Sequence, residues 1–348
     1  MNSTNNNKVF LLISGLLFFT AVSPAPAQKP AESKQAQHEQ KELLQTLLQG
    51  MQQQRSLLRS GEFKANAVVT DSTTPLRVEL KAECFFSQQF QQFRFDQDVK
   101  QVTPHPKKKG ETRTLRSRSI YVKTPEYSIH TEGNNTSVRI NEPDYKPYGY
   151  YSPFDIRVIG LINGAELLHG VSRSGSRWFL PGVLQTYQTY TLKHITRQSE
   201  GVFEITWLFG KSNEFKLMLW IDERHGYTPT NYLVYRKTGT PKKFEQTPFI
   251  KSEITWKEIE NVWVPVALNT EGQFNHRRLI MKFDWLKVNQ PVSATVFTVD
   301  GMQLPQGRRI ENDGDPGIIK TSVIDHRAGT KKLIRGGTFI PDDPSKKP

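Results

Sequence analysis

Apolar residues recur at two different periods along this chain, and the change of period divides it into a helical and a β part. Over residues 36–59, leucines and a methionine fall at helical spacing, with Gln, Lys and Arg between them. This spacing places the apolar side chains on one face of an amphipathic helix. Ser60 and Gly61 are expected to end the helix, because glycine suits the left-handed conformation after a last turn. The leucine face therefore needs a partner surface.

From Glu62 onward the apolar period is two, which predicts β-strands with one covered face and one wet face. Short turns such as 210–213 and 260–261 join consecutive strands, as in an antiparallel meander. The strands expected from this alternation span residues 63–69, 78–86, 203–209, 215–221, 232–236, 250–256, 262–268 and 279–285.

The alternation fails in two internal segments. Residues 155–170 carry Ile and Leu at spacings that suit one or two short helices, interrupted by Gly160 and Gly164. We expect this helical insert to cover one mouth of a curved sheet, because it lies between two β blocks. Residues 141–153 are rich in Tyr and Pro. They predict a rigid packed loop, although their rings could also stack on sugars.

The first 27 residues have the pattern of a secretory signal peptide. Lys8 precedes an apolar run over 9–22, and the A-x-A cleavage pattern at 25–27 follows. The run of about 14 residues is too short to cross a bilayer as a helix. Gln28 rather than cysteine follows the expected cut. A periplasmic or secreted protein is therefore predicted, with a short membrane anchor as the alternative.

These patterns divide the chain into four parts. Residues 1–27 are the signal peptide, 28–40 a flexible leader, 41–312 a β domain with its N-terminal helix, and 313–348 a loosely ordered tail. The tail is assigned because aromatic residues are scarce there and Gly, Lys and Asp are common. It has room for one strand, near residues 318–324.

Composition adds a strong positive charge. The 47 Lys and Arg outnumber the 34 Asp and Glu, giving a net charge of +13. Such a surplus favours anionic partners such as membrane headgroups or acidic wall polymers, and the export signal argues against nucleic acid. Lys107–Lys109 form the densest basic run and are expected at an exposed loop tip. Cys84, the single cysteine, alternates with apolar residues and is expected to be a buried, inert thiol.

The sequence contains no pattern that specifies a catalytic chemistry. Residues 170–174 lack the second glycine of a G-x-S-x-G elbow, and no Walker loop or G-x-G-x-x-G occurs. The eight His are scattered, and the Asp313–Asp315 segment lacks the further oxygen ligands of a calcium loop. We therefore expect no enzyme activity, no metal and no cofactor. Glycoside hydrolysis needs only two carboxylates, so a secreted polysaccharide hydrolase stays open as an alternative.

The most specific motifs lie in the C-terminal part of the β domain. They are W-K-E-I-E-N-V-W-V-P over 256–265, F-D-W over 283–285, V-N over 288–289, F-T-V-D-G over 297–301 and L-P-x-G over 304–307. This part, about residues 200–310, resembles the outer-membrane lipoprotein-sorting-protein-like (LolA/LolB-like) families of exported bacterial proteins, in their divergent planctomycete form. The resemblance implies an α+β fold: a half-open antiparallel β-barrel, or strongly curved sheet, with helices covering the concave face. In that family an arginine holds the covering helices, and no motif places it here.

An apolar cavity under such helices would suit a lipid or lipoprotein acyl chain, so we expect a monomeric carrier or sensor in the cell envelope. A basic scaffold that binds anionic polymer is the other alternative. The same strand residues could also form a filled core. The expected cavity wall consists of Phe203, Ile205, Trp207, Leu217, Leu219, Ile254, Trp256, Met281 and Phe283.

Overall fold

Antiparallel hairpins make up most of the computed structural model. The structure describes residues 31–131, 137–142, 156–161, 180–273, 276–302, 309–312, 320–323 and 334–335. The predicted signal peptide, most of the Tyr/Pro-rich loop, the second half of the insert and most of the tail lie outside these residues. Residues 40–348 form one compact unit, and it is this unit whose packing is described below.

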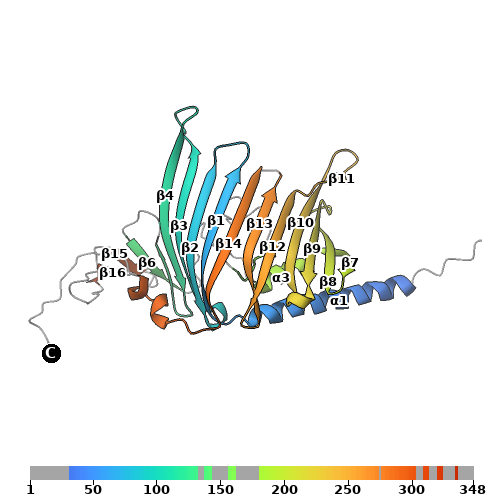
Figure 1. Cartoon of the computed structure of the whole chain (residues 1–348), viewed down its shortest axis with the longest axis horizontal. Coiled ribbons are helices and arrows are strands. Elements are labelled where there is room, and N and C mark those ends of the chain that lie inside the picture. The colour runs from blue at the N-terminus through green and yellow to red at the C-terminus, as the bar shows by residue number, and fades with distance from the viewer. Residues whose placement is uncertain are drawn as a thin grey trace, which may run out of the picture. The chain divides into compact units, whose positions relative to one another are not determined.

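One mixed but almost wholly antiparallel sheet holds all 17 strands of the described residues (Figure 1). Hydrogen-bonded neighbours follow the order β7-β8-β9-β10-β12-β13-β14-β1-β2-β3-β4-β5-β6-β15-β16-β17, with β11 paired to β10. Only β6 and β15 run parallel. The strands are β1 Gly61–Asp71, β2 Arg77–Ser87, β3 Gln92–Pro104, β4 Thr112–Lys123, β5 Ser128–Thr131, β6 Ser137–Asn141, β7 Thr191–Ser199, β8 Val202–Phe209, β9 Phe215–Asp222, β10 Thr228–Thr238, β11 Lys243–Phe244, β12 Ile250–Ile259, β13 Val262–Gly272, β14 Arg277–Val288, β15 Arg309–Asn312, β16 Lys320–Val323 and β17 Ile334–Arg335.

The predicted antiparallel curved sheet is confirmed, and no ladder joins its two edge strands, β7 and β17, within the described residues. All eight strands expected from the alternation are present. The strands that alternation missed include β4, whose first seven residues are exposed on both faces. Without a covered face such a strand has no reason to alternate.

The two faces of the sheet differ in chemistry. We call the face that bears Phe63 and Met281 the apolar face, and the face that bears their neighbours Lys64 and Lys282 the charged face. Along β1 the burial of successive side chains alternates accordingly. Cys84 lies on the apolar face as a free, buried thiol, as predicted.

The N-terminal helix, α1, spans Ala31–Ser56. It begins before the predicted start at residue 36, so residues 31–40, assigned above to a flexible leader, are helical. It also ends before Gly61, which opens β1 instead of capping the helix. Glycine is required there for packing: a Cβ atom would lie 2.7 Å from the Phe86 ring. The prediction of a C-cap was wrong because close approach, not a left-handed turn, selects this glycine.

The leucine face of α1 finds its partner on the apolar face of β8, β9 and β10. Leu47, Leu48 and Met51 are buried in one cluster with residues of these strands. At Gly50 a side chain would collide with the Tyr227 ring, 2.6 Å from an added Cβ. Gly50 therefore lets α1 lie close to the turn between β9 and β10.

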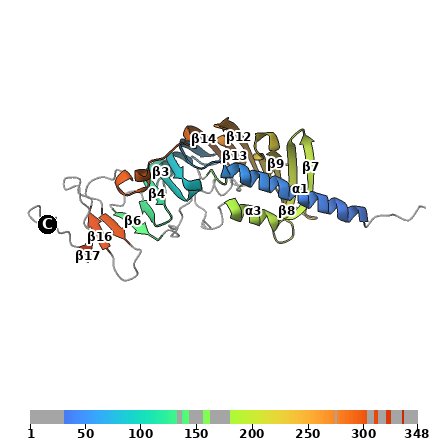
Figure 2. The same cartoon turned by 90° about the horizontal axis from the view of Figure 1, so that it is seen from below.

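The expected helical insert is described only over residues 156–161, which form turns and not a helix. A helix that the pattern did not predict, α3, spans Leu180–Gln188. It lies on the same side of β8 and β9 as α1 (Figure 2). Among the described residues, no helix is both long and apolar enough to cross a bilayer.

The charged face carries a second layer near its lower end. Two short helical turns, η3 Ala294–Phe297 and η4 Asp300–Met302, pack there through Phe297 and Met302 against Ile120 and Val122 of β4. The F-T-V-D-G motif at 297–301 lies within this layer. At Gly301 an added Cβ would lie 1.9 Å from the Thr295 carbonyl oxygen, so only glycine fits.

Arg94 of β3 ties this layer to the sheet. Its guanidinium donates to the carbonyl oxygens of Val296 and Gly301, at 2.9 and 2.8 Å. It also forms two hydrogen bonds of 2.6 Å with the Asp96 carboxylate. Both side chains are nearly buried, at 8% and 11% exposure. The two opposite charges therefore neutralise each other at a site that is largely shielded from water.

The upper end of β1 provides a pH-dependent contact. Asp71 accepts hydrogen bonds from the Thr73 hydroxyl and amide and from the Thr74 amide, and these lower its pKa to about 2. A lowered pKa means that the ionised form stabilises the fold: the contribution is present above the ordinary value of 3.8 and disappears as the pH falls to about 2. We expect Asp71→Asn to be less stable than wild type at pH 6 and equally stable at pH 2, measured by urea unfolding. A difference that persists at pH 2 would contradict this.

Candidate functional site

The nine predicted wall residues all lie on the apolar face, but in two clusters. Phe203, Ile205, Trp207, Leu217 and Leu219 of β8 and β9 form the first group. Ile254, Met281 and Phe283 of β12 and β14 belong to the second, with Trp256 packed against it. Eight of them are at most 9% exposed, and Trp256 is partly buried. The structure thus buries eight of these residues and does not gather the nine into one group.

Three segments that contribute no strand pack against these two clusters, and we call them the cover: residues 40–56 of α1, the turn at 156–161, and α3. The first cluster receives Leu47, Leu48, Met51, Val158, Leu161, Val183, Leu184 and Tyr187 from them. The second cluster receives Ile156 and Ile159. In these contacts apolar side chains pack against the apolar face of the sheet, so close packing rather than hydrogen bonding stabilises them.

Arg55, in the last turn of α1, makes the main polar link within this cover. Its guanidinium donates to the carbonyl oxygens of Ile156 and Ile159, at 3.0 and 2.8 Å, and also to that of Arg157. The guanidinium carbon lies 5.5 Å from the centre of the Trp256 ring. One side chain therefore joins α1, the 156–161 turn and β12. Sequence reasoning missed it, because an arginine on the polar side of an amphipathic helix looks like any solvated charge.

The same turn is attached to the sheet at a second point. The Arg157 guanidinium carbon lies 5.2 Å from the ring centre of Phe90 and 5.1 Å from that of Phe93. Cation–π contacts of this kind contribute about 0.5–2 kcal/mol each. Arg55 and Arg157 together fix a turn whose own backbone hydrogen bonds are few.

Two polar aromatic side chains, Tyr187 of α3 and Trp207 of β8, pack against each other between α3 and the sheet. Tyr187 donates its hydroxyl to the Leu161 carbonyl oxygen, and its ring centre lies 5.2 Å from that of Trp207. Burial raises the pKa of Tyr187 well above its ordinary value, so the hydroxyl remains a donor. Trp207 is completely buried, and among the described residues its indole N–H has no hydrogen-bond partner. Leaving such a donor unpaired costs about 1–3 kcal/mol.

The β12–β13 hairpin carries the W-K-E-I-E-N-V-W-V-P motif, and side chains of this and the neighbouring motifs form hydrogen bonds between adjacent segments. The Trp256 indole donates to the Pro229 carbonyl oxygen at 2.7 Å, and the Trp285 indole to that of Pro265 at 2.9 Å. Asn289 bonds the Arg59 amide and the Leu57 carbonyl oxygen, at 2.7 and 2.9 Å. The motif tryptophans and asparagine thus hold strands and the α1–β1 connection in place.

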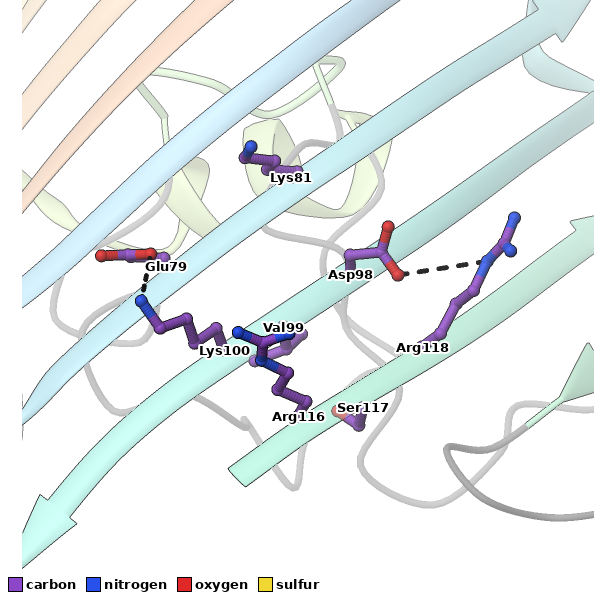
Figure 3. A pocket seen from close by; sticks show the side chains of 8 residues that line it. All are labelled: Glu79, Lys81, Asp98, Val99, Lys100, Arg116, Ser117 and Arg118. Atoms are coloured by element: carbon purple, nitrogen blue, oxygen red, sulfur yellow. Dashed lines mark hydrogen bonds and ion pairs between the residues drawn. The ribbon is translucent and has the colours of Figure 1, made fainter. Parts of the chain in front are cut away.

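The charged face has a hollow of its own. A groove of about 490 Å³ follows strands β2, β3 and β4 (Figure 3). Its lining consists of Glu79, Lys81, Asp98, Val99, Lys100, Arg116, Ser117 and Arg118. Sequence reasoning noticed the basic loop at 107–109 but not this groove, because the groove residues come from three strands.

No cluster of three or more His, Cys, Asp or Glu able to hold a metal ion occurs in the described part of the chain. His225 lies beside Asp222, at 3.3 Å, and its ring faces Trp263 at 4.3 Å.

Comparison with known proteins finds no matching family model and no matching curated protein. Among solved structures, the chain is similar to a LolA superfamily protein from Nitrosomonas europaea (12% identity, TM-score 0.32, covering 74% of this chain and 98% of that one). It is also similar to an outer membrane lipoprotein-sorting protein domain from Vibrio parahaemolyticus (9%, 0.33, 75% and 100%). A DUF1329 family protein from Desulfovibrio piger gives 9% identity and a TM-score of 0.39, covering 75% and 99%. The family named from the sequence motifs is thus among the solved structures to which the chain is similar.

Proposed function

We propose that this protein binds a single lipid or lipoprotein acyl chain between the apolar face of its sheet and the covering segments, as a carrier or sensor in the cell envelope. The observation that carries the proposal is the cover itself. It consists of helical and turn segments that lie on a broad apolar sheet surface and are held by apolar contacts, by Arg55 and Arg157, and by the Tyr187 hydroxyl. In this proposal α1, the 156–161 turn and α3 cover the concave face, and α1 moves aside when the ligand enters.

A comparison of burial free energies, for the acyl chain and for the helix side chains that it replaces, supports this proposal. An acyl chain that buries roughly a dozen methylenes gains about 10 kcal/mol, at about 0.8 kcal/mol per methylene. Withdrawing Leu47, Leu48 and Met51 from the sheet costs about 5–9 kcal/mol at the usual value for a buried aliphatic side chain. The ligand can therefore replace the helix side chains without a large net cost, and the core need not be hollow beforehand.

Trp207 gives the proposed site a polar end. Its unpaired indole N–H can donate to the carboxyl or ester oxygen of an acyl ligand, which removes the cost of the buried donor. The wall then consists of Phe203, Ile205, Leu217 and Leu219 around that donor. A hydrocarbon without an oxygen gains less from the same site.

Lipid binding is tested directly on the exported protein. After purification under mild conditions, native mass spectrometry should show a lipid adduct at one per chain, and a fluorescent fatty acid such as cis-parinaric acid should bind saturably at the same ratio. Trp207→Phe keeps the ring and removes the donor, and we expect it to weaken fatty-acid binding by about tenfold, corresponding to about 1.4 kcal/mol. Trp263→Phe, on the half-buried tryptophan beside His225, serves as the matched control and should bind as wild type does. Absence of both the adduct and the fluorescence change would overturn the proposal.

A further inference from the structure

The groove on the charged face is built from registered cross-strand rows. In one row Glu79, Lys100 and Arg116 are neighbours on β2, β3 and β4. In the next row Lys81, Asp98 and Arg118 are neighbours. Residues that face each other across an antiparallel pair lie about 5 Å apart at Cβ, so each row acts as one electrostatic unit.

The two carboxylates of the groove are already engaged. Glu79 lies 2.8 Å from the Arg77 guanidinium and 3.3 Å from the Lys100 amine, and Asp98 lies 4.0 Å from Arg118. These contacts are visible as dashed lines where both partners are drawn (Figure 3). The hydrogen bonds from Arg77 and then Lys100 lower the pKa of Glu79, so it is ionised and its charge is shared by two cations.

Positive charge remains in excess after this pairing. Arg116 is the direct neighbour of Lys100, and like charges in that position repel each other. Within the described part of the chain, neither Arg116 nor Lys81 takes part in an ion pair or a hydrogen bond. An anionic group bridging Arg116 and Lys100 relieves this repulsion, and Lys81 in the next row offers a further cation.

The excess continues along the β3–β4 hairpin. Residues 98–118 contain seven Lys and Arg and two acidic residues. Lys107, Lys108 and Lys109 lie at its exposed tip, as predicted from the sequence. Arg113 is also exposed, but on the opposite face of β4 from Arg116 and Arg118. Side chains on one face of a strand repeat about every 6.8 Å. The cations therefore form a row along the hairpin, not a single spot.

The shape of the surface favours a chain over a flat partner. Two residues below Arg118, Ile120 is covered by the η3–η4 layer through Phe297 and Met302. This layer rises from the charged face and bounds the lower end of the groove. A flexible chain can lie in such a trough, whereas a planar membrane would touch the raised layer and the hairpin tip.

We propose that the charged face of β2, β3 and β4 binds a linear polyanion, whose phosphate or carboxylate groups contact Arg116, Lys100, Lys81 and Arg118 in turn. Binding through these exposed cations is electrostatic and decreases steeply with salt. This surface lies on the opposite face of the sheet from the proposed acyl site, and its function does not depend on that site.

The test uses the full exported chain and long-chain inorganic polyphosphate, with binding measured by fluorescence anisotropy at several salt concentrations. The variant Lys81→Gln/Arg116→Gln should bind at least about tenfold more weakly and show a smaller salt slope. The control Lys193→Gln/Lys257→Gln removes the same charge from exposed sites on β7 and β12, and should bind within about twofold of wild type. Fatty-acid binding should be unchanged in both variants, which separates this proposal from the previous one.

The same binding assay with other ligands identifies the kind of partner. Polyglutamate binding as tightly as polyphosphate would assign carboxylate groups to the ligand, and weaker binding would assign phosphate; monomeric phosphate should bind far more weakly than either. Three results would overturn the proposal: no polyanion binding at low salt, equal losses in the two double variants, or preferential binding to anionic phosphatidylglycerol vesicles that requires Lys107–Lys109 and not Arg116. The last of these would assign the surface to a membrane.

Discussion

Replacing Arg94 with methionine is expected to lower the free energy of unfolding by about 3–5 kcal/mol, because the change leaves the buried Asp96 carboxylate without its partner. It also leaves the carbonyl oxygens of Val296 and Gly301 without their donor. Urea unfolding followed by circular dichroism measures the loss. Hydrogen exchange should show the η3–η4 layer opening before the rest of the sheet.

A double-mutant cycle separates the charge from the rest of this effect. Asp96→Leu alone should also be strongly destabilising, and the double variant Arg94→Met/Asp96→Leu should cost clearly less than the sum of the two, by about 2 kcal/mol or more. Arg118 of β4 and Asp98 of β3 supply the control, since they form an exposed pair on the same face of the sheet, with 65% and 70% exposure. Removing that pair should cost at most about 1 kcal/mol. Strict additivity at Arg94 and Asp96 would show that the buried pair does not hold the layer.

The second large effect is expected at Arg55. Arg55→Ala removes three hydrogen bonds to the 156–161 turn and the contact with Trp256, and should cost about 2–4 kcal/mol of local stability. The loss should appear first as faster amide exchange at Leu161, whose N–H bonds the Val158 carbonyl oxygen at 3.0 Å. Arg55→Lys keeps the charge but not the planar fork, so an intermediate effect is expected.

Arg59→Ala provides the control for Arg55. Arg59 is exposed, and among the described residues its hydrogen bonds use only backbone atoms, which the substitution preserves. It should leave exchange in the cover unchanged. If the proposed acyl site is correct, Arg55→Ala should also take up cis-parinaric acid faster than wild type, because the cover opens more often. Exchange at Leu161 as slow as in wild type would show that other contacts hold the cover.

Much of the fold could be predicted because burial of one face imposes a local pattern. Strands β1, β2, β8, β9, β10, β12, β13 and β14 all have one covered and one wet face, and alternation found each of them. The same reasoning identified the nine apolar residues of the proposed wall as inward-facing. It missed β4, which is exposed on both faces over its first seven residues, and it misplaced both ends of α1.

The polar residues of the candidate sites could not be identified from local sequence patterns. Arg55 bonds residues more than 100 positions away, and Arg94 bonds carbonyl groups more than 200 positions away. Every residue has a backbone carbonyl oxygen, so the sequence around an arginine does not indicate which carbonyl groups will accept its hydrogen bonds. The groove depends on the register of β2, β3 and β4, which likewise joins residues far apart in the sequence.

The sequence by itself determined the antiparallel sheet, its apolar face, the amphipathic α1 helix and the excess of positive charge, because each follows from composition or from spacing between near neighbours. Only the tertiary structure decided which segments pack against the apolar face, that Arg55 links α1 to the 156–161 turn, and that Arg157 attaches this turn to the sheet. It also decided that the Trp207 N–H is buried without a partner among the described residues, and that Lys81, Lys100, Arg116 and Arg118 line one groove. These features depend on contacts between distant segments, and such contacts are set by how the whole chain packs.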